Sequence, residues 1–183
     1  MQPKLIIING PLGSGKSTLA KMYAEKHPLT LKLDIDQVWG LISGWRESPE
    51  ITTPLAKRMA IAMAEIHLNA GYNVVIPQFY HSESQYLELD ELANNCKAKL
   101  YEFYIDLAEK EAIDRYILRG QAGGYPDGFR PGSIVKRLGG VIKLADMHVQ
   151  SKAVTLLRPD TITIVPRYNE VEETYAELMK GLA

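Results

Sequence analysis

Eight residues near the start of the chain, Gly10–Ser17, read GPLGSGKS and have a spacing that suits phosphate binding. They satisfy the pattern G-x-x-x-x-G-K-[ST] between an apolar run at Lys4–Asn9 and a helix-forming stretch at Gly15–His27. Glycines let backbone N–H groups converge on phosphate oxygens, and the positive end of the following helix attracts the same anions. The residues that we expect to bind nucleotide phosphates are Gly10, Pro11, Leu12, Gly13, Ser14, Gly15, Lys16, Ser17 and Thr18.

Two side chains of this loop have chemistry of their own. Lys16 is expected to reach the β- and γ-phosphates, where its charge would assist catalysis, and the Ser17 hydroxyl is expected to bind Mg²⁺. The alternative is a glycine-rich turn from strand to helix that binds nothing.

A second candidate group is the acidic pair in the stretch LDIDQVWG, Asp34 and Asp36. We expect both at the carboxyl end of a strand over Leu29–Asp34, where open α/β sheets bind their ligands. A hydroxyl that accepts a phosphoryl group needs a carboxylate to take its proton, and Asp36 suits that role. Asp34 suits Mg²⁺ binding or substrate positioning; alternatively, both residues only end the strand and cap a helix.

The segment after Asp36 offers material for an acceptor pocket. Trp39 and Trp45 provide flat apolar surface, while Arg46 and Arg58 provide contacts for an anion. Ordinary packing of both tryptophans is the alternative.

Residues 115–152 contain seven basic side chains and two acidic ones. Arginine neutralises charge on transferring phosphoryl oxygens, and the five glycines between residues 120 and 132 favour a mobile lid. Arg115 and Arg119, one helical turn apart, are the first candidates to face a nucleotide, and Arg130 is the next. Each could instead lie on a solvated surface.

These residues need a scaffold, and the chain alternates strand and helix patterns, which predicts an α/β fold with a parallel sheet. Further strands are expected at Asn73–Ile76, Lys99–Ile105 and Thr161–Val165. The expected helices are Thr53–Ala70, with Leu55, Met59, Ala62, Met63 and Ile66 as its core face, then Ser82–Asn95, Glu109–Arg119, one starting near Gly132, and Val171–Lys180.

Together, GPLGSGKST and LDIDQVW resemble the small P-loop kinases of the zeta toxin, polynucleotide kinase, chloramphenicol phosphotransferase and gluconate kinase group. The resemblance implies a P-loop NTPase fold, with a five-stranded parallel sheet in the order 2-3-1-4-5 and a mobile lid over ATP. It also implies Asp36 as the catalytic base. One departure is Pro77-Gln78 after the third strand, where many relatives have an acidic residue. Either Asp34 or Asp36 and water molecules then complete the Mg²⁺ shell, or Gln78 instead forms hydrogen bonds to the acceptor.

Length and composition bear on the number of domains and on the cellular location. The chain has 183 residues, a net charge of −1 and one cysteine, Cys96, so no intramolecular disulfide is possible. We expect a single domain over residues 1–183 without a membrane segment or signal peptide, located in the cytoplasm.

The sequence therefore favours an ATP- and Mg²⁺-dependent kinase that acts on a small molecule. Alternatives are a polynucleotide-end or nucleotide-sugar kinase, disfavoured because no basic, aromatic-rich stripe lies outside the lid, and a nucleotide-dependent switch without an acceptor. Oligomeric state and the choice of ATP over GTP are left open.

Overall fold

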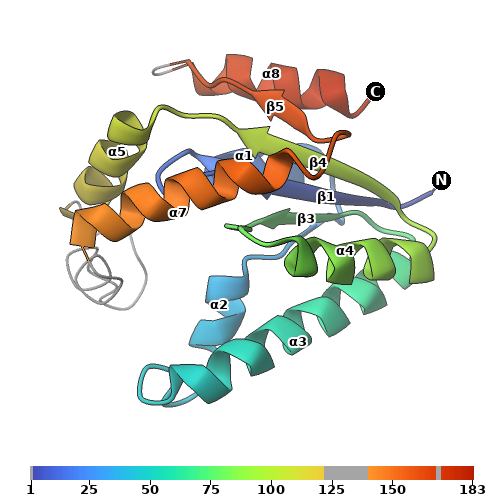
Figure 1. Cartoon of the computed structure of the whole chain (residues 1–183). Helices are drawn as coiled ribbons and strands as arrows, with labels where there is room; N and C mark the ends of the chain where they lie inside the picture. The colour runs from blue at the N-terminus through green and yellow to red at the C-terminus, as the bar shows by residue number, and fades with distance from the viewer. Residues whose placement is uncertain (1, 122–139, 168–169) are drawn as a thin grey trace.

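A computed structural model describes residues 2–121, 140–167 and 170–183 of the chain (Figure 1). Five parallel strands form one sheet in the order β2-β3-β1-β4-β5, which confirms the expected topology. The strands are β1 (Lys4–Asn9), β2 (Leu31–Lys32), β3 (Val74–Pro77), β4 (Lys99–Ile105) and β5 (Ile162–Ile164).

Helices cover both faces of this sheet (Figure 1). They are α1 (Lys16–Lys26), α2 (Ile35–Gly40), α3 (Pro49–Asn69), α4 (Glu83–Asn95), α5 (Glu109–Gln121), α7 (Gly140–Thr155) and α8 (Val171–Gly181). Side chains alternate along β1: Ile6 and Ile8 pack with α1 and α8, whereas Leu5 and Ile7 pack with α3 and α4. Because both faces are buried, β1 is a continuous apolar run instead of an alternating pattern.

The second strand is shorter than expected, and its end is the start of a helix. β2 covers only Leu31–Lys32, while Asp34 is the N-cap of α2 and its Oδ1 accepts a hydrogen bond from the Asp36 N–H at 3.1 Å. The prediction that the strand reaches Asp34 was therefore wrong. A carboxylate that satisfies an exposed N–H of a first helical turn favours the helix over a continued strand.

The longest helix, α3, differs from its prediction in both start and orientation. It begins at Pro49, one turn before the expected Thr53, because proline fits a first helical position, and Pro54 lies within the helix. The face that we expected in the core is exposed; Ile66, for example, is 73% exposed. The buried residues are Thr52, Ala56, Ala60, Ala64 and Leu68. Small alanine side chains let the helix approach its neighbours closely, and the larger residues then remain outside.

The other helices were predicted within a few residues, except α2, which was not predicted, and α7. The expected start near Gly132 lies outside the described residues, and α7 is described from Gly140. None of the helices that the model describes combines the length and the apolar character needed to cross a membrane.

Candidate functional site

The loop between β1 and α1 has the backbone shape that its glycines predict. Gly10, Gly13 and Gly15 have φ angles of 147°, 85° and 95°, which residues with a side chain rarely adopt. Gly15 is also the N-cap of α1, so the loop leads directly into the positive end of that helix.

Close approach of other backbone segments restricts two of these glycines further. A Cβ atom at Gly13 would collide with the carbonyl oxygen of Ala112 in α5, and one at Gly10 would lie 2.8 Å from the carbonyl oxygen of Ile105. The loop is thus held between α1, α5 and the end of β4, and a larger residue at either position would displace it.

Lys16 is buried at the base of the loop. Its Nζ donates hydrogen bonds to the carbonyl oxygens of Gly10 at 2.8 Å and Pro11 at 2.7 Å. Ser14 is also buried, and its N–H donates to the Pro11 carbonyl at 3.2 Å. The ammonium group is therefore held at the loop, where a phosphate bound to α1 would meet it.

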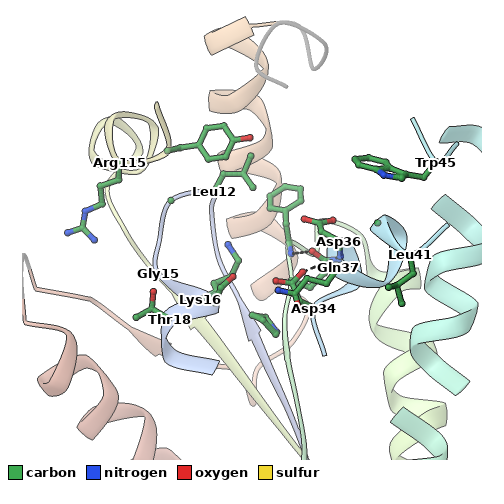
Figure 2. A pocket seen from close by; sticks show the side chains of 17 residues that line it. Leu12, Gly15, Lys16, Thr18, Asp34, Asp36, Gln37, Leu41, Trp45 and Arg115 are labelled. Atoms are coloured by element: carbon green, nitrogen blue, oxygen red, sulfur yellow. Dashed lines mark hydrogen bonds between the residues drawn. The ribbon is translucent and has the colours of Figure 1, made fainter. Parts of the chain in front are cut away.

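A cavity of about 590 Å³ opens beside this loop, a size typical of small-molecule sites (Figure 2). One side, which we call the phosphate-loop wall, is formed by Leu12, Gly13, Gly15, Lys16, Ser17, Thr18, Arg115 and Tyr116. The other side, which we call the α2 wall, is formed by Asp34, Asp36, Gln37, Gly40, Leu41, Trp45, Pro77, Gln78 and Phe79. Gly10, Pro11 and Ser14, which were also expected to bind phosphates, are not among the residues that line this cavity.

Asp34 and Asp36 belong to the α2 wall (Figure 2). Although the strand was predicted too long, the first turn of α2 brings both carboxylates to the cavity. Desolvation by the surrounding walls and, to a lesser extent, the Asp34 charge raise the pKa of Asp36, the Lys16 charge lowers it, and the net result is a pKa of about 6. Since the side chain remains open to solvent, Asp36 can exchange protons at neutral pH.

Of the four residues that were expected to form an acceptor pocket after Asp36, one lines the cavity and three do not. Trp45 lines the cavity, while Trp39 lies behind it, 4.3 Å from Trp45 between ring centroids, and donates from Nε1 to Thr52 Oγ1 at 2.8 Å. The guanidinium of Arg46 lies 4.5 Å from the centroid of the Trp45 ring and is not among the residues lining the cavity. Arg58 lines a different cavity, between α3 and α4.

Gln78 follows β3 and lines the α2 wall, so the structure brings it next to the acidic pair. Its Oε1 accepts a hydrogen bond from the Phe79 N–H at 2.9 Å, and its own N–H donates to the Ile8 carbonyl at 3.1 Å. Pro77 is the last residue of β3, as expected from its missing N–H.

Asn9 is a positioning residue that the sequence did not single out. It is fully buried, and its Oδ1 accepts from the N–H groups of Gly10 at 2.7 Å and Tyr80 at 2.9 Å. Its Nδ2 donates to the Tyr80 carbonyl at 3.0 Å and the Tyr86 hydroxyl at 2.8 Å. One amide thereby connects the start of the phosphate loop with the segment that carries Gln78 and Phe79.

Of the three candidate arginines, the structure describes the side chain of Arg115 only. Arg115 lies in α5, lines the phosphate-loop wall and pairs with Glu111 at 2.5 Å. Arg119 lies in α5, but its side chain is outside the described parts of the model, as is all of Arg130. Residues 122–139, the middle of the expected lid, are therefore not described.

Several cavity residues were absent from the sequence prediction: Gln37, Gly40, Leu41, Pro77, Phe79 and Tyr116. Gln37 and Phe79 directly follow predicted site residues, so proximity in sequence could have suggested them. Leu41 and Tyr116 reach the cavity only through the packing of α2 and α5, which has no local signal.

The donors near the phosphate loop fit Mg²⁺, which prefers a few protein oxygens together with phosphate oxygens and water. Ser17 offers a hydroxyl, and Asp34 a carboxylate, in the same cavity. Within residues 2–121, 140–167 and 170–183, no three His, Cys, Asp or Glu side chains gather into a metal cluster. The arrangement therefore suits a metal that arrives with a phosphate ligand.

Comparison with solved structures finds the same fold in several proteins. A protein of Chloroflexus aurantiacus J-10-fl superposes with a TM-score of 0.71 at 16% identity, over 100% of both chains. A gluconokinase from Sinorhizobium meliloti 1021 gives 0.62 at 16% identity, over 99% of this chain and 92% of that one. An APS kinase from Mycobacterium tuberculosis, solved with AMPPNP and APS, gives 0.61 at 14% identity, over 99% and 98%.

Sequence comparison gives the family. No curated protein matches the chain significantly. A family model described as an AAA domain matches residues 5–129, a range that includes the phosphate loop, the acidic pair and Arg115. Since the match covers well over half of the sequence, and the fold is that of small P-loop kinases, the chain belongs to the AAA domain family of P-loop proteins.

Proposed function

We propose that the protein is an ATP-dependent phosphotransferase that moves the γ-phosphate of ATP to a hydroxyl group of a small molecule. The main support is the shared cavity of Lys16 and Asp36, which combines a phosphate-binding loop with a carboxylate able to accept a proton. The structural neighbours described as a gluconokinase and an APS kinase are in keeping with such an activity.

The phosphate-loop wall would bind the nucleotide. Backbone N–H groups at the start of α1 and the Lys16 ammonium would contact the phosphates, with Ser17 and Asp34 holding Mg²⁺. Bound MgATP supplies the electrophilic phosphoryl group. Arg115 lies on the same wall and would neutralise phosphate charge; Arg119 and Arg130 stay predictions with the same role.

The α2 wall would bind the acceptor. Asp36 would orient the acceptor hydroxyl and take its proton as the new bond to phosphorus forms. A pKa of about 6 leaves most of Asp36 ionised at pH 7, yet makes it more basic than an ordinary aspartate. Gln78 would donate hydrogen bonds to the acceptor from its amide group.

A screen for ADP release would test this function. Purified protein with ATP and Mg²⁺ is incubated with nucleosides, sugars, hydroxylated antibiotics and 5′-hydroxyl oligonucleotides, and products are identified by mass spectrometry. Acceptor-dependent ADP release with a product heavier by one phosphoryl group, lost in Lys16→Ala, supports the proposal. Release independent of every acceptor indicates a switch or ATPase instead, and phosphorylation of oligonucleotides alone indicates a polynucleotide-end kinase.

A further inference from the structure

The α2 wall has a chemical character that indicates which acceptors can bind. We propose, resting on the function above, that the acceptor is a hydroxyl compound without negative charge, and that it carries a flat apolar group. Three properties of the wall support this class: its charges, its amides and its aromatic surface.

The charges of this wall are negative. Asp34 and Asp36 both line it, and the nucleotide phosphates would add further negative charge on the opposite side. Among the described residues that line the cavity, the cations are Lys16 and Arg115, and both lie on the phosphate-loop wall. An anionic acceptor next to Asp36 would therefore be repelled from the position where its hydroxyl must react.

Neither arginine that the sequence offered to an anionic acceptor is among the residues lining the α2 wall. Arg46 lies over the ring of Trp45, and Arg58 lines the cavity between α3 and α4, together with Glu65, Glu88 and Glu91. The two polar residues that do line the wall besides the aspartates are Gln37 and Gln78. Primary amides form hydrogen bonds with neutral hydroxyl groups, but they carry no charge that could compensate the charge of a carboxylate or phosphate.

The remaining surface of the wall is apolar. Trp45, Phe79 and Leu41 contribute it, and Leu41 is 74% exposed in the structure. Trp45 is held by the ring of Trp39, which is itself anchored to Thr52, so the aromatic surface is preformed. A flat apolar group placed here would gain contact area without ordering the protein. A small polyol would leave this surface exposed to water.

Matched pairs of acceptors test the charge part of the inference. Members of a pair share the ring and the reacting hydroxyl but differ in one charged group: phenyl β-D-glucuronamide with phenyl β-D-glucuronide, mandelamide with mandelate, and, for transfer to the 5′-hydroxyl, adenosine with adenosine 3′-monophosphate. We expect kcat/KM for the uncharged member to be at least about tenfold higher in the pair that is turned over. Gln37→Lys should reduce this preference, whereas the matched control Arg58→Gln, at the other cavity, should leave it unchanged.

A variant of Trp45 tests the second part of the inference, that the acceptor carries a flat apolar group. Trp45→Ala should lower kcat/KM for the aromatic acceptor by about tenfold. The kcat/KM for a matching acceptor that lacks the aromatic ring should change much less. Equal or better use of anionic members, or a control variant that alters the preference, overturns the inference while the kinase function stands. If no compound of the pairs or of the broader screen is phosphorylated although ATP binds, the proposed function fails, and this inference with it.

Discussion

The two walls of the cavity are built in different ways. The phosphate-loop wall consists mainly of consecutive residues, Leu12–Thr18, whose glycines are fixed by φ angles and by contact with α5. The α2 wall combines two segments that are distant in sequence, 34–45 and 77–79, and depends on side chains. The phosphate-loop wall depends on backbone shape, so it can bind a nucleotide in any relative that keeps the glycines. The α2 wall depends on side chains, so a few substitutions there can change which acceptor binds. Variants should therefore separate nucleotide binding from transfer.

The largest separation is expected from Asp36→Asn. The variant keeps the shape of the side chain but cannot take the acceptor's proton, so transfer should fall by about 10²–10⁴-fold while ATP affinity remains nearly unchanged. Nucleotide affinity by calorimetry and single-turnover transfer would measure the two effects. Transfer at the parent rate would remove Asp36 from the mechanism. If Asp34→Asn has no transfer activity while Asp36→Asn remains active, Asp34 is the base and Asp36 the Mg²⁺ ligand.

A second variant should affect both steps. Lys16→Ala removes the ammonium from the phosphate loop, so transfer should fall by at least about 10²–10³-fold, with weaker ATP binding. Lys21→Ala is the matched control because Lys21 is an exposed lysine of the same helix, 3.6 Å from Glu25. Turnover of a correctly folded Lys16→Ala protein at the parent rate would contradict the role of the loop.

Asp34→Asn should produce a smaller and more selective change. If Asp34 helps to bind Mg²⁺, the Mg²⁺ concentration for half-maximal rate should rise about tenfold, with a lesser drop in the rate at saturation. A Mg²⁺ titration of transfer gives both quantities. An unchanged Mg²⁺ requirement would leave Asp34 as the N-cap of α2 only.

The smallest effects concern pH. Asp36 must be ionised to act as a base, so kcat/KM should fall as the pH drops below about 6, and Asp36→Asn should lack this dependence. Because the folded-state pKa of about 6 is above the unfolded value of 3.8, the stability of the parent falls as the pH rises from the lower to the higher value. The melting temperature of Asp36→Asn relative to the parent should therefore increase slightly from pH 4 to pH 7.5. A decrease over that range would contradict the raised pKa.

The sequence predicted the fold where local signals were strong. The ranges of β1 and β4 were predicted correctly, because runs rich in β-branched or aromatic residues between turn residues favour a strand. The short helix α2 was missed, since six residues are too few to show a helical period. The buried face of α3 was assigned to its large residues, but the alanines are buried, and only packing decides between these faces.

The site was predictable to a similar degree. The phosphate loop is a local motif, and the structure brings six of the nine residues expected there to one cavity with Asp34, Asp36, Trp45, Gln78 and Arg115. Arg46 and Arg58 could not be placed from sequence, because their positions depend on where Trp45 stacks and on the rotation of α3. Leu41 and Tyr116 reach the cavity from helices whose packing is equally nonlocal.

The hydrogen bonds of Asn9 have a thermodynamic consequence. The same side-chain oxygen accepts from Gly10 at the start of the phosphate loop and from Tyr80, next to Phe79 on the α2 wall. A ligand that shifts or tightens one of these segments therefore acts on the other through a buried amide. Nucleotide and acceptor should bind cooperatively, and linkage requires that each changes the affinity of the other by the same factor.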